Sequence, residues 1–151
     1  MSMSEAMQEL EAAAGTPKLP VVAALLALLG LADSVYLTVH HFTAEPVPCS
    51  IVEGCETVLT SAYAEIAGIP LAAFGALAYF IAFSLAILTV FGNRSIWLLF
   101  GIQSFIMAGV SVYLIYLQGA VIGAFCQFCL ISAATSISLF VVFLISKFLS
   151  R

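Results

Sequence analysis

Residues 126–146 read CQFCLISAATSISLFVVFLIS, a C-x-x-C pair at the start of an uncharged apolar run. About 20 such residues cross a hydrocarbon core of about 30 Å, so the run predicts a transmembrane helix that begins at the cysteines. Cys126 and Cys129 are three residues apart and therefore share one face of that helix. The positive end of the helix dipole favours a thiolate at Cys126. The stretch thus predicts a redox-active dithiol at a membrane edge.

The composition of the whole chain indicates the same class. Of its 151 residues, 64% are hydrophobic and 8% are charged, whereas soluble domains carry about 25% charged residues. Eight acidic residues against four basic ones give a formal net charge of −4. This balance excludes a nucleic-acid partner, because such proteins carry a basic patch. We interpret the chain as an all-α integral membrane protein.

Four runs are uncharged or nearly so and long enough to span a membrane. They cover residues 19–42, 69–91, 95–118 and 126–146, and they predict a bundle of four transmembrane helices. Pro70 falls in the first turn of the second run, where its missing N–H costs nothing, and Gly92-Asn93 breaks the chain before the third. We expect one membrane domain over residues 19–151. The tail over residues 1–18 begins acidic, unlike a signal peptide, and is expected to be retained.

The basic residues predict the orientation of the bundle. Four helices place Lys18, Arg94, Lys147 and Arg151 on one face, which the positive-inside rule makes cytoplasmic, together with both termini. The opposite, outer face receives the loop 43–68 and the link 118–125. All four cysteines fall there, namely Cys49, Cys55, Cys126 and Cys129. We expect a multi-pass protein of the cell membrane with its cysteines in a compartment where disulfides form.

The outer loop contains a second cysteine pair. Cys49 follows Pro46-Val47-Pro48, which favours extended chain. After Cys55, apolar residues recur at helical spacing and predict a short amphipathic helix on the membrane surface. They are Val58, Leu59, Ala62 and Ile66. Such a helix would form a lid over the bundle, with Cys55 at its start near Cys126 and with Cys49 on the water-facing side.

The order of these features resembles the vitamin K epoxide reductase family in its prokaryotic form. The similarity extends from about Gly30 to Ile145. It rests on Cys49, Gly54-Cys55, Val58, Ser61, Gly68-Ile69-Pro70, Gly75, Tyr79, Tyr113-Leu114, Tyr116-Leu117-Gln118 and the terminal C-x-x-C. The resemblance implies a four-helix bundle that holds a quinone, either menaquinone, ubiquinone or a related one, near the C-x-x-C. It implies a thiol oxidase that supports disulfide-bond formation.

The resemblance also implies a role for each cysteine. The thiolate of a thioredoxin-like (DsbA-like) partner would attack Cys49 and release Cys55. Cys55 would then attack Cys126 of a Cys126–Cys129 disulfide, and the freed Cys129 would pass electrons to the quinone. Each step is thiol–disulfide exchange and needs a thiolate and an accessible sulfur. Because the chain ends at Arg151 without a fused thioredoxin-like domain, we expect the partner to be a separate protein.

Other positions are assigned by the same motif. Ser61 is expected to support the loop. An apolar wall for a planar ring is predicted from Phe74, Tyr79, Tyr113, Tyr116, Phe125 and Phe128. Animal members have a tyrosine and an asparagine where this chain has Ala133 and Leu71. Epoxide reduction therefore stays open, whereas quinone reduction does not depend on these two positions.

Several alternatives accompany this interpretation. The same cysteines could serve a non-catalytic redox sensor or scaffold, or be small buried hydrophobes. No metal site is expected, because C-x5-C is wider than the usual zinc spacing. Asp33 is the charged residue within a predicted span. We favour a structural role for it, with hydrogen bonds to Ser34, Ser104 or Ser111, over a role in supplying protons to a quinone. His40 and His41 are interpreted as interfacial anchors outside the site.

Overall fold

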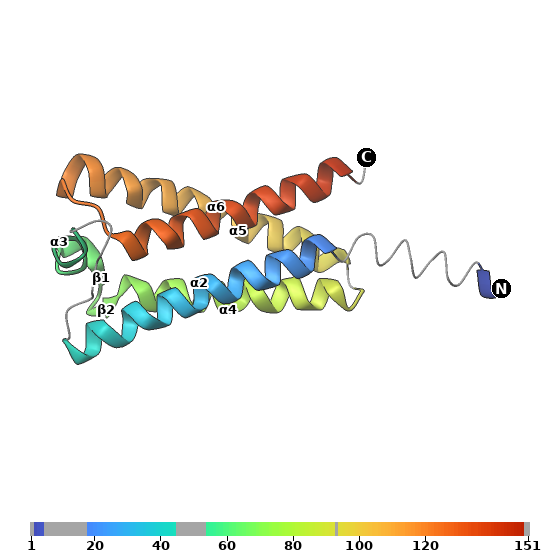
Figure 1. Cartoon of the computed structure of the whole chain (residues 1–151), viewed down its shortest axis with the longest axis horizontal. Helices are drawn as coiled ribbons and strands as arrows, with labels where there is room; N and C mark the ends of the chain where they lie inside the picture. Colours follow the sequence, from blue (N-terminus) through green and yellow to red (C-terminus); the bar gives the residue numbers. More distant parts are fainter. Residues whose placement is uncertain (1, 5–17, 45–53, 93, 150–151) are drawn as a thin grey trace.

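The computed structural model describes residues 2–4, 18–44, 54–92 and 94–149. Four long helices make up most of this part of the chain and lie lengthwise in one bundle (Figure 1). They are α2 (Lys18–Thr43), α4 (Leu71–Val90), α5 (Arg94–Tyr116) and α6 (Gln127–Leu149). Each is long and apolar enough to cross a membrane. The predicted four-helix membrane bundle is therefore confirmed, with helix boundaries a few residues from those expected.

One end of the bundle carries the cysteines, and we call it the cysteine end. The helix α3 (Cys55–Leu59), the short 3₁₀ turn η1 (Ala62–Ala64) and the strands β1 (Glu65–Ile66) and β2 (Ile69–Pro70) cover this end. We call residues 54–70 the lid. The start of α2 and the end of α6 lie at the opposite end (Figure 1).

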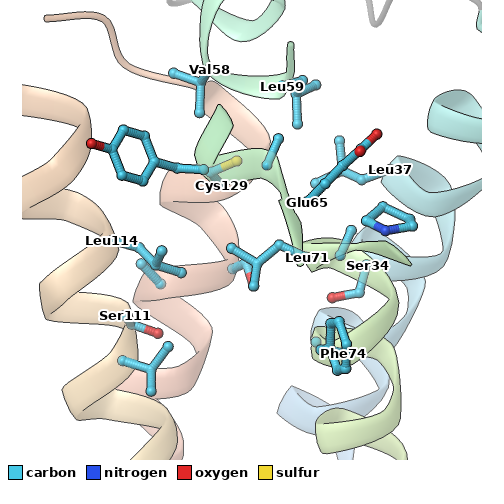
Figure 2. Close-up of a pocket in the computed structure, with 18 of the residues that line it drawn as sticks. Ser34, Leu37, Val58, Leu59, Glu65, Leu71, Phe74, Ser111, Leu114 and Cys129 are labelled. Carbon is cyan, nitrogen blue, oxygen red and sulfur yellow. The ribbon is translucent and has the colours of Figure 1, made fainter. Parts of the chain in front are cut away.

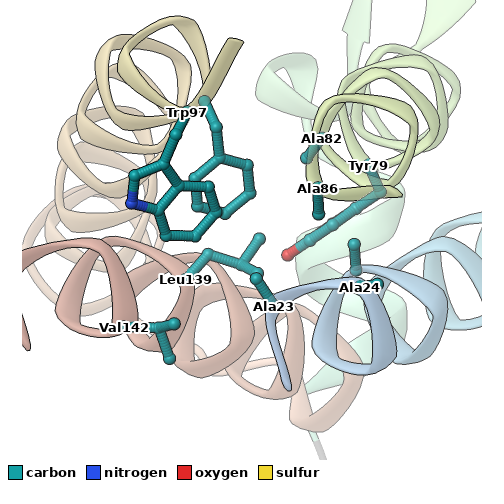
Figure 3. Close-up of a cluster of buried hydrophobic side chains, with 10 residues drawn as sticks. Ala23, Ala24, Tyr79, Ala82, Ala86, Trp97, Leu139 and Val142 are labelled. Atoms are coloured by element: carbon teal, nitrogen blue, oxygen red, sulfur yellow. The ribbon is translucent and has the colours of Figure 1, made fainter. Parts of the chain in front are cut away.

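Small residues allow α2 and α4 to pack closely. Ala23, Ala27 and Gly30 lie on the buried side of α2, where a Cβ at Gly30 would come 2.5 Å from the Cδ1 atom of Tyr79. Lipid tails are as apolar as leucine, so close packing of this kind holds membrane helices together. Figure 3 shows Tyr79 reaching from α4 toward the alanines of α2. Large apolar side chains such as Leu25 and Phe105 are exposed on the outside, where lipid would cover them.

The helix in the outer loop is shorter than the sequence predicts. The helix α3 stops at Leu59, and the hydroxyl of Ser61 donates a hydrogen bond to the carbonyl of Val58 at 2.7 Å. This local bond competes with continuation of the helix. The chain then forms an antiparallel hairpin that pairs Ile66 with Ile69. Ile66 therefore lies on a strand and not on the apolar face of a helix, which corrects the expected helical pattern.

Two backbone features position the start of α6. The helix α5 continues as the π-helical turn η2 (Leu117–Ile122), and Gly123 ends it with φ +75°, a conformation that glycine adopts without strain. The N–H of Ala124 donates to the carbonyl of Gln118 at 3.0 Å. The chain thus turns back at the cysteine end and enters α6 directly after Cys126. Turns of π-helix occur often at functional sites.

Candidate functional site

The C-x-x-C lies at the first turn of α6. Cys126 immediately precedes the helix, and its carbonyl accepts the N–H of Leu130 at 2.9 Å. The N–H of Cys129 donates to the Sγ of Cys126 at 3.4 Å. Both sulfurs are free thiols. They are held side by side by the helical spacing that the sequence predicts.

The surroundings of Cys126 favour its thiolate. The pKa of the Cys126 thiol is lowered to about 7, chiefly because the Cys129 side chain hydrogen-bonds it; backbone hydrogen bonds from Cys129 and Phe128 add to this effect. Burial and the negative charge of Asp33 act in the opposite direction. Hydrogen bonds to the charged form therefore outweigh desolvation. A thiolate at Cys126 is available near neutral pH for exchange with a disulfide.

The lid brings a third cysteine to the pair. Cys55, Val58 and Cys126 form a buried cluster, and Gly54 is packed so closely on Phe125 that its Cβ position lies 2.8 Å from the Phe125 N atom. Cys55 is disulfide-bonded, whereas both cysteines of the C-x-x-C are free. Cys49 lies outside the described residues.

A cavity of about 1240 Å³ opens beside the other cysteine. Its walls come from α2, the lid, α4, α5 and α6, and Figure 2 shows Cys129 next to Val58 and Leu59 of the lid. Cys129 lines this cavity, whereas Cys126 is fully buried and is not among the described lining residues. The C-x-x-C therefore has two sides. One sulfur packs against the lid cysteine and the other lines the cavity.

Three polar residues of the cavity, Tyr79, Ser132 and Ser136, are paired with one another. The hydroxyl of Tyr79 donates to the carbonyl of Ser132 at 2.6 Å. The hydroxyl oxygens of Ser132 and Ser136 lie 3.0 Å and 2.7 Å from the hydroxyl oxygen of Tyr79. Apolar side chains such as Leu71 and Leu114 form other parts of the cavity wall. A largely apolar cavity with a few polar groups is the usual form of a small-molecule site, and these walls suit a planar, weakly polar ring with an apolar tail.

Comparison with known proteins agrees with this arrangement. The sequence profile described as the vitamin K epoxide reductase family matches residues 21–144. The chain belongs to this family. A relative is the thiol-disulfide oxidoreductase LTO1 of Arabidopsis thaliana, with 35% identity over 118 residues, which is 72% of this chain and 31% of the relative. The chain thus spans about a third of the length of that relative.

The structure of this vitamin K epoxide reductase family member separates the predicted aromatic residues. Phe74 and Tyr79 line the cavity. Tyr113 and Phe125 are 58% and 40% exposed and lie outside the described lining, as does Phe128, which packs on Tyr36 with ring centroids 5.2 Å apart. Small and aliphatic side chains form most of the wall instead. The sequence pattern cannot tell these cases apart, because aromatic residues also collect at membrane interfaces.

The two histidines lie at the cavity, although the sequence analysis leaves them outside the site. His40 and His41 both line it, and the Nε2 of His41 lies 2.8 Å from the Oε1 of Glu65 on β1. This contact joins the end of α2 to the lid. Ser61 also lines the cavity, and its hydroxyl bonds the carbonyl at the end of α3 as described above; its role in supporting the loop stays a prediction.

Asp33 differs from the expectation that serine hydroxyls on neighbouring helices satisfy it. Its Oδ2 atom is buried and has no hydrogen-bond partner among the described residues. Ser104, one of the proposed partners, donates instead to the carbonyl of Gly101 at 3.0 Å. The expected hydrogen bond between Asp33 and a neighbouring serine is therefore not observed for Oδ2 among the described residues.

The sequence analysis gave no role to Gln118, Ser132 or Ser136. Gln118 is 3% exposed, lines the cavity and accepts the N–H of Cys126 through its Oε1 at 2.9 Å. A polar side chain eight residues before a C-x-x-C, within an apolar run, is the signal that would have identified it. Ser132 and Ser136 follow Cys129 at helical spacing, and that periodicity would have placed them on its face.

Proposed function

We propose that this chain is a quinone-linked thiol oxidase that supports disulfide-bond formation. Electrons would pass from a thioredoxin-like protein through Cys49 and Cys55 to Cys126 and Cys129, and then to a quinone in the cavity. The observation that carries the proposal is the two-sided C-x-x-C, with Cys126 against the lid cysteine and Cys129 in the wall of the cavity. Membership of the vitamin K epoxide reductase family and the thiol-disulfide oxidoreductase relative support membrane thiol redox activity.

The exchange steps follow from these positions. A partner dithiol reduces a Cys49–Cys55 disulfide by attack on Cys49, and the partner becomes oxidised. The Cys55 thiolate then attacks the Sγ of Cys126 in the Cys126–Cys129 disulfide, and Cys129 leaves as a thiolate. Cys49 next attacks Cys55 and displaces Cys126. The lowered pKa of Cys126, about 7, makes it a good leaving group in this last step, because thiols of lower pKa leave faster.

The final step needs an acceptor on the cavity side. Re-formation of the Cys126–Cys129 disulfide releases two electrons and two protons, which are the equivalents that a bound quinone accepts. Cys129 lines the cavity and is the sulfur that can contact such a molecule. Phe74, Leu71 and Leu114 would hold its ring among apolar groups, which also exclude water from the sulfur. Tyr79, which lines the same cavity, would also contact the ring.

We further propose that the cysteine end faces the outside of the cell membrane and that both termini are cytoplasmic. The basic residues Lys18 and Lys147 flank the opposite end of α2 and α6, as the positive-inside rule requires. A membrane-impermeant maleimide added to intact cells after reduction should label Cys49. Labelling that requires permeabilised cells would reverse this orientation.

Two cysteine substitutions test the electron path. We expect Cys49→Ala to abolish oxidation of a reduced thioredoxin-like protein while dithiothreitol still drives quinone reduction, because a small dithiol can reach the C-x-x-C directly. Cys129→Ala should stop both reactions, since it removes the sulfur beside the cavity. The assay is the loss of absorbance of a soluble quinone analogue, corrected for the rate without protein.

The outcomes separate the possible roles. Quinone reduction by Cys129→Ala would show that another group contacts the acceptor. If Cys49→Ala lost the dithiothreitol reaction as completely as Cys129→Ala, the assignment of Cys49 to the protein partner would be wrong. A non-catalytic sensor would show no catalytic loss of absorbance with either donor, even with the unmutated chain.

A further inference from the structure

Gln118 is a buried amide that lies between the C-x-x-C and the cavity. It belongs to the π-helical turn η2, and its side chain is 3% exposed. Its backbone carbonyl accepts the N–H of Ala124 at 3.0 Å, and its Oε1 accepts the N–H of Cys126 at 2.9 Å. The residue is thus tied twice to the segment that leads into the dithiol.

The contact with Cys126 determines which way the amide is turned. A backbone N–H can only donate, so the side-chain atom that faces Cys126 must be the oxygen, and the nitrogen must be at the other side. Among the described residues, the Nε2 of Gln118 has no acceptor within hydrogen-bond distance. Gln118 also lines the cavity, as Cys129 does. The residue is 3% exposed, and a donor in such surroundings is costly to leave without a partner, unless a bound molecule satisfies it.

Four other polar groups of the cavity already have hydrogen-bond partners. The hydroxyls of Tyr79, Ser132 and Ser136 are engaged with one another, and the hydroxyl of Ser61 donates to Val58. The Nε2 of Gln118 has two hydrogens and uses neither within the described residues. Its side chain is also bonded directly to the backbone of the dithiol.

We propose that the Nε2 of Gln118 donates a hydrogen bond to a carbonyl oxygen of the quinone that occupies the cavity beside Cys129. This inference rests on the proposed function and adds a polar anchor to it. The same amide fixes the backbone of Cys126 through Oε1, so one side chain sets the position of a ring carbonyl relative to the dithiol. Within apolar walls such a bond is stronger than in water.

The test compares two ligands of the same shape. The first is 2,3-dimethyl-1,4-naphthoquinone, and the second is 2,3-dimethylnaphthalene, which has no carbonyl groups. Binding is measured by equilibrium dialysis in the full-length chain carrying Cys129→Ser, so that no complete reduction occurs. In this background, Gln118→Met should weaken binding of the naphthoquinone about five- to tenfold, as expected for the loss of one hydrogen bond. Binding of the hydrocarbon should change by less than about twofold, since it accepts no hydrogen bond.

An infrared measurement gives an independent readout. In the chain that retains Gln118, the C=O stretching band of bound carbonyl-labelled naphthoquinone should lie at lower frequency than with Gln118→Met, because the hydrogen bond weakens the C=O bond. Gln103→Met is the matched control on α5, because the Nε2 of Gln103 already donates to the carbonyl of Ala78 at 2.7 Å. It should leave the affinity and the band unchanged.

Each result decides the inference. Equal weakening of both ligands by Gln118→Met would show that Gln118 only shapes the cavity, and an unchanged affinity and band would exclude the proposed hydrogen bond. If the chain with Gln118 intact failed to bind the naphthoquinone at all, the proposed function would be overturned, and this inference with it.

Discussion

Gly54 is the point at which the lid rests on the backbone that precedes Cys126. A Cβ at this position would lie 2.8 Å from the N atom of Phe125 and closer still to its carbonyl oxygen. Both are backbone atoms, so no side-chain rotation can relieve the overlap. Atoms in good contact are about 3.5–4.0 Å apart, so relief of the contact with the N atom alone requires Gly54→Ala to move the lid from the loop by at least about 0.7 Å.

That displacement acts directly on the relay, because Gly54 and Phe125 immediately precede Cys55 and Cys126. A misplacement of about 1 Å between reacting groups can cost about 100-fold in rate. We therefore expect Gly54→Ala to slow exchange between Cys55 and Cys126 by about that factor. Direct reduction of the C-x-x-C by dithiothreitol should change little, since it does not use the lid.

The exchange rate can be measured without a quinone. In a Cys129→Ala background, the Cys126 thiolate attacks Cys55 of a Cys49–Cys55 disulfide, releases Cys49 as a thiolate and forms the mixed Cys55–Cys126 disulfide. The released Cys49 can reverse this step, so the mixed disulfide rises to an equilibrium level, and the approach to that level reports the exchange rate. Acid quenching and mass mapping of disulfides after a pH jump give its rate of formation. Gly109→Ala is the matched control, because a Cβ there meets no atom within 4 Å. A rate for Gly54→Ala equal to that of the control would refute the close-contact argument.

Two further predictions concern the bonds around the site. The thiolate absorbance of Cys126 near 240 nm should appear with a midpoint at about pH 7 and be lost below it, because the pKa of this thiol is lowered. Cys129→Ala should raise the midpoint, because it removes the principal hydrogen bond to the thiolate. Asp33→Asn should lower the midpoint, because it removes a negative charge that opposes the thiolate. A midpoint near the ordinary thiol value would contradict the first claim. Gly30→Ala would place a Cβ 2.5 Å from the Cδ1 atom of Tyr79. It should reduce the free energy of unfolding, measured by denaturation in detergent, by about 1–3 kcal/mol. Unchanged stability would show that the Tyr79 ring can move away.

Much of the fold could be predicted from local sequence. Four apolar runs with Asp33 as their single charged residue can only satisfy their backbone groups within a membrane as helices, so the bundle of α2, α4, α5 and α6 followed from composition and run length. The C-x-x-C at the start of α6 followed from spacing alone. The lid was predicted less well. The spacing of Val58, Leu59, Ala62 and Ile66 indicated one helix, whereas α3 ends at Leu59 and the chain continues into a 3₁₀ turn and a hairpin.

The site itself depended on contacts between distant segments. The sequence predicted that both cysteine pairs lie at one end of the bundle, because the number of spans determines the side on which each loop lies. The described residues agree with this for Cys55, Cys126 and Cys129. It could not show that Cys126 packs on Cys55 while Cys129 lines the cavity, since this division depends on how the lid sits on the loop at Gly54. Nor could it distinguish Phe74, which lines the cavity, from Phe125, which is 40% exposed.

Gln118 shows the same limit most clearly. The sequence determined that a polar amide lies near the end of an apolar span, and from it alone that amide could face lipid headgroups, water or the bundle. Tertiary structure decided among these, because the π-helical turn and Gly123 bring the chain back so that the N–H of Cys126 meets the Oε1 of Gln118. Hydrogen-bond partners of this kind are set by the path of the backbone in space, whereas membrane spans are set by the local balance of apolar and charged residues.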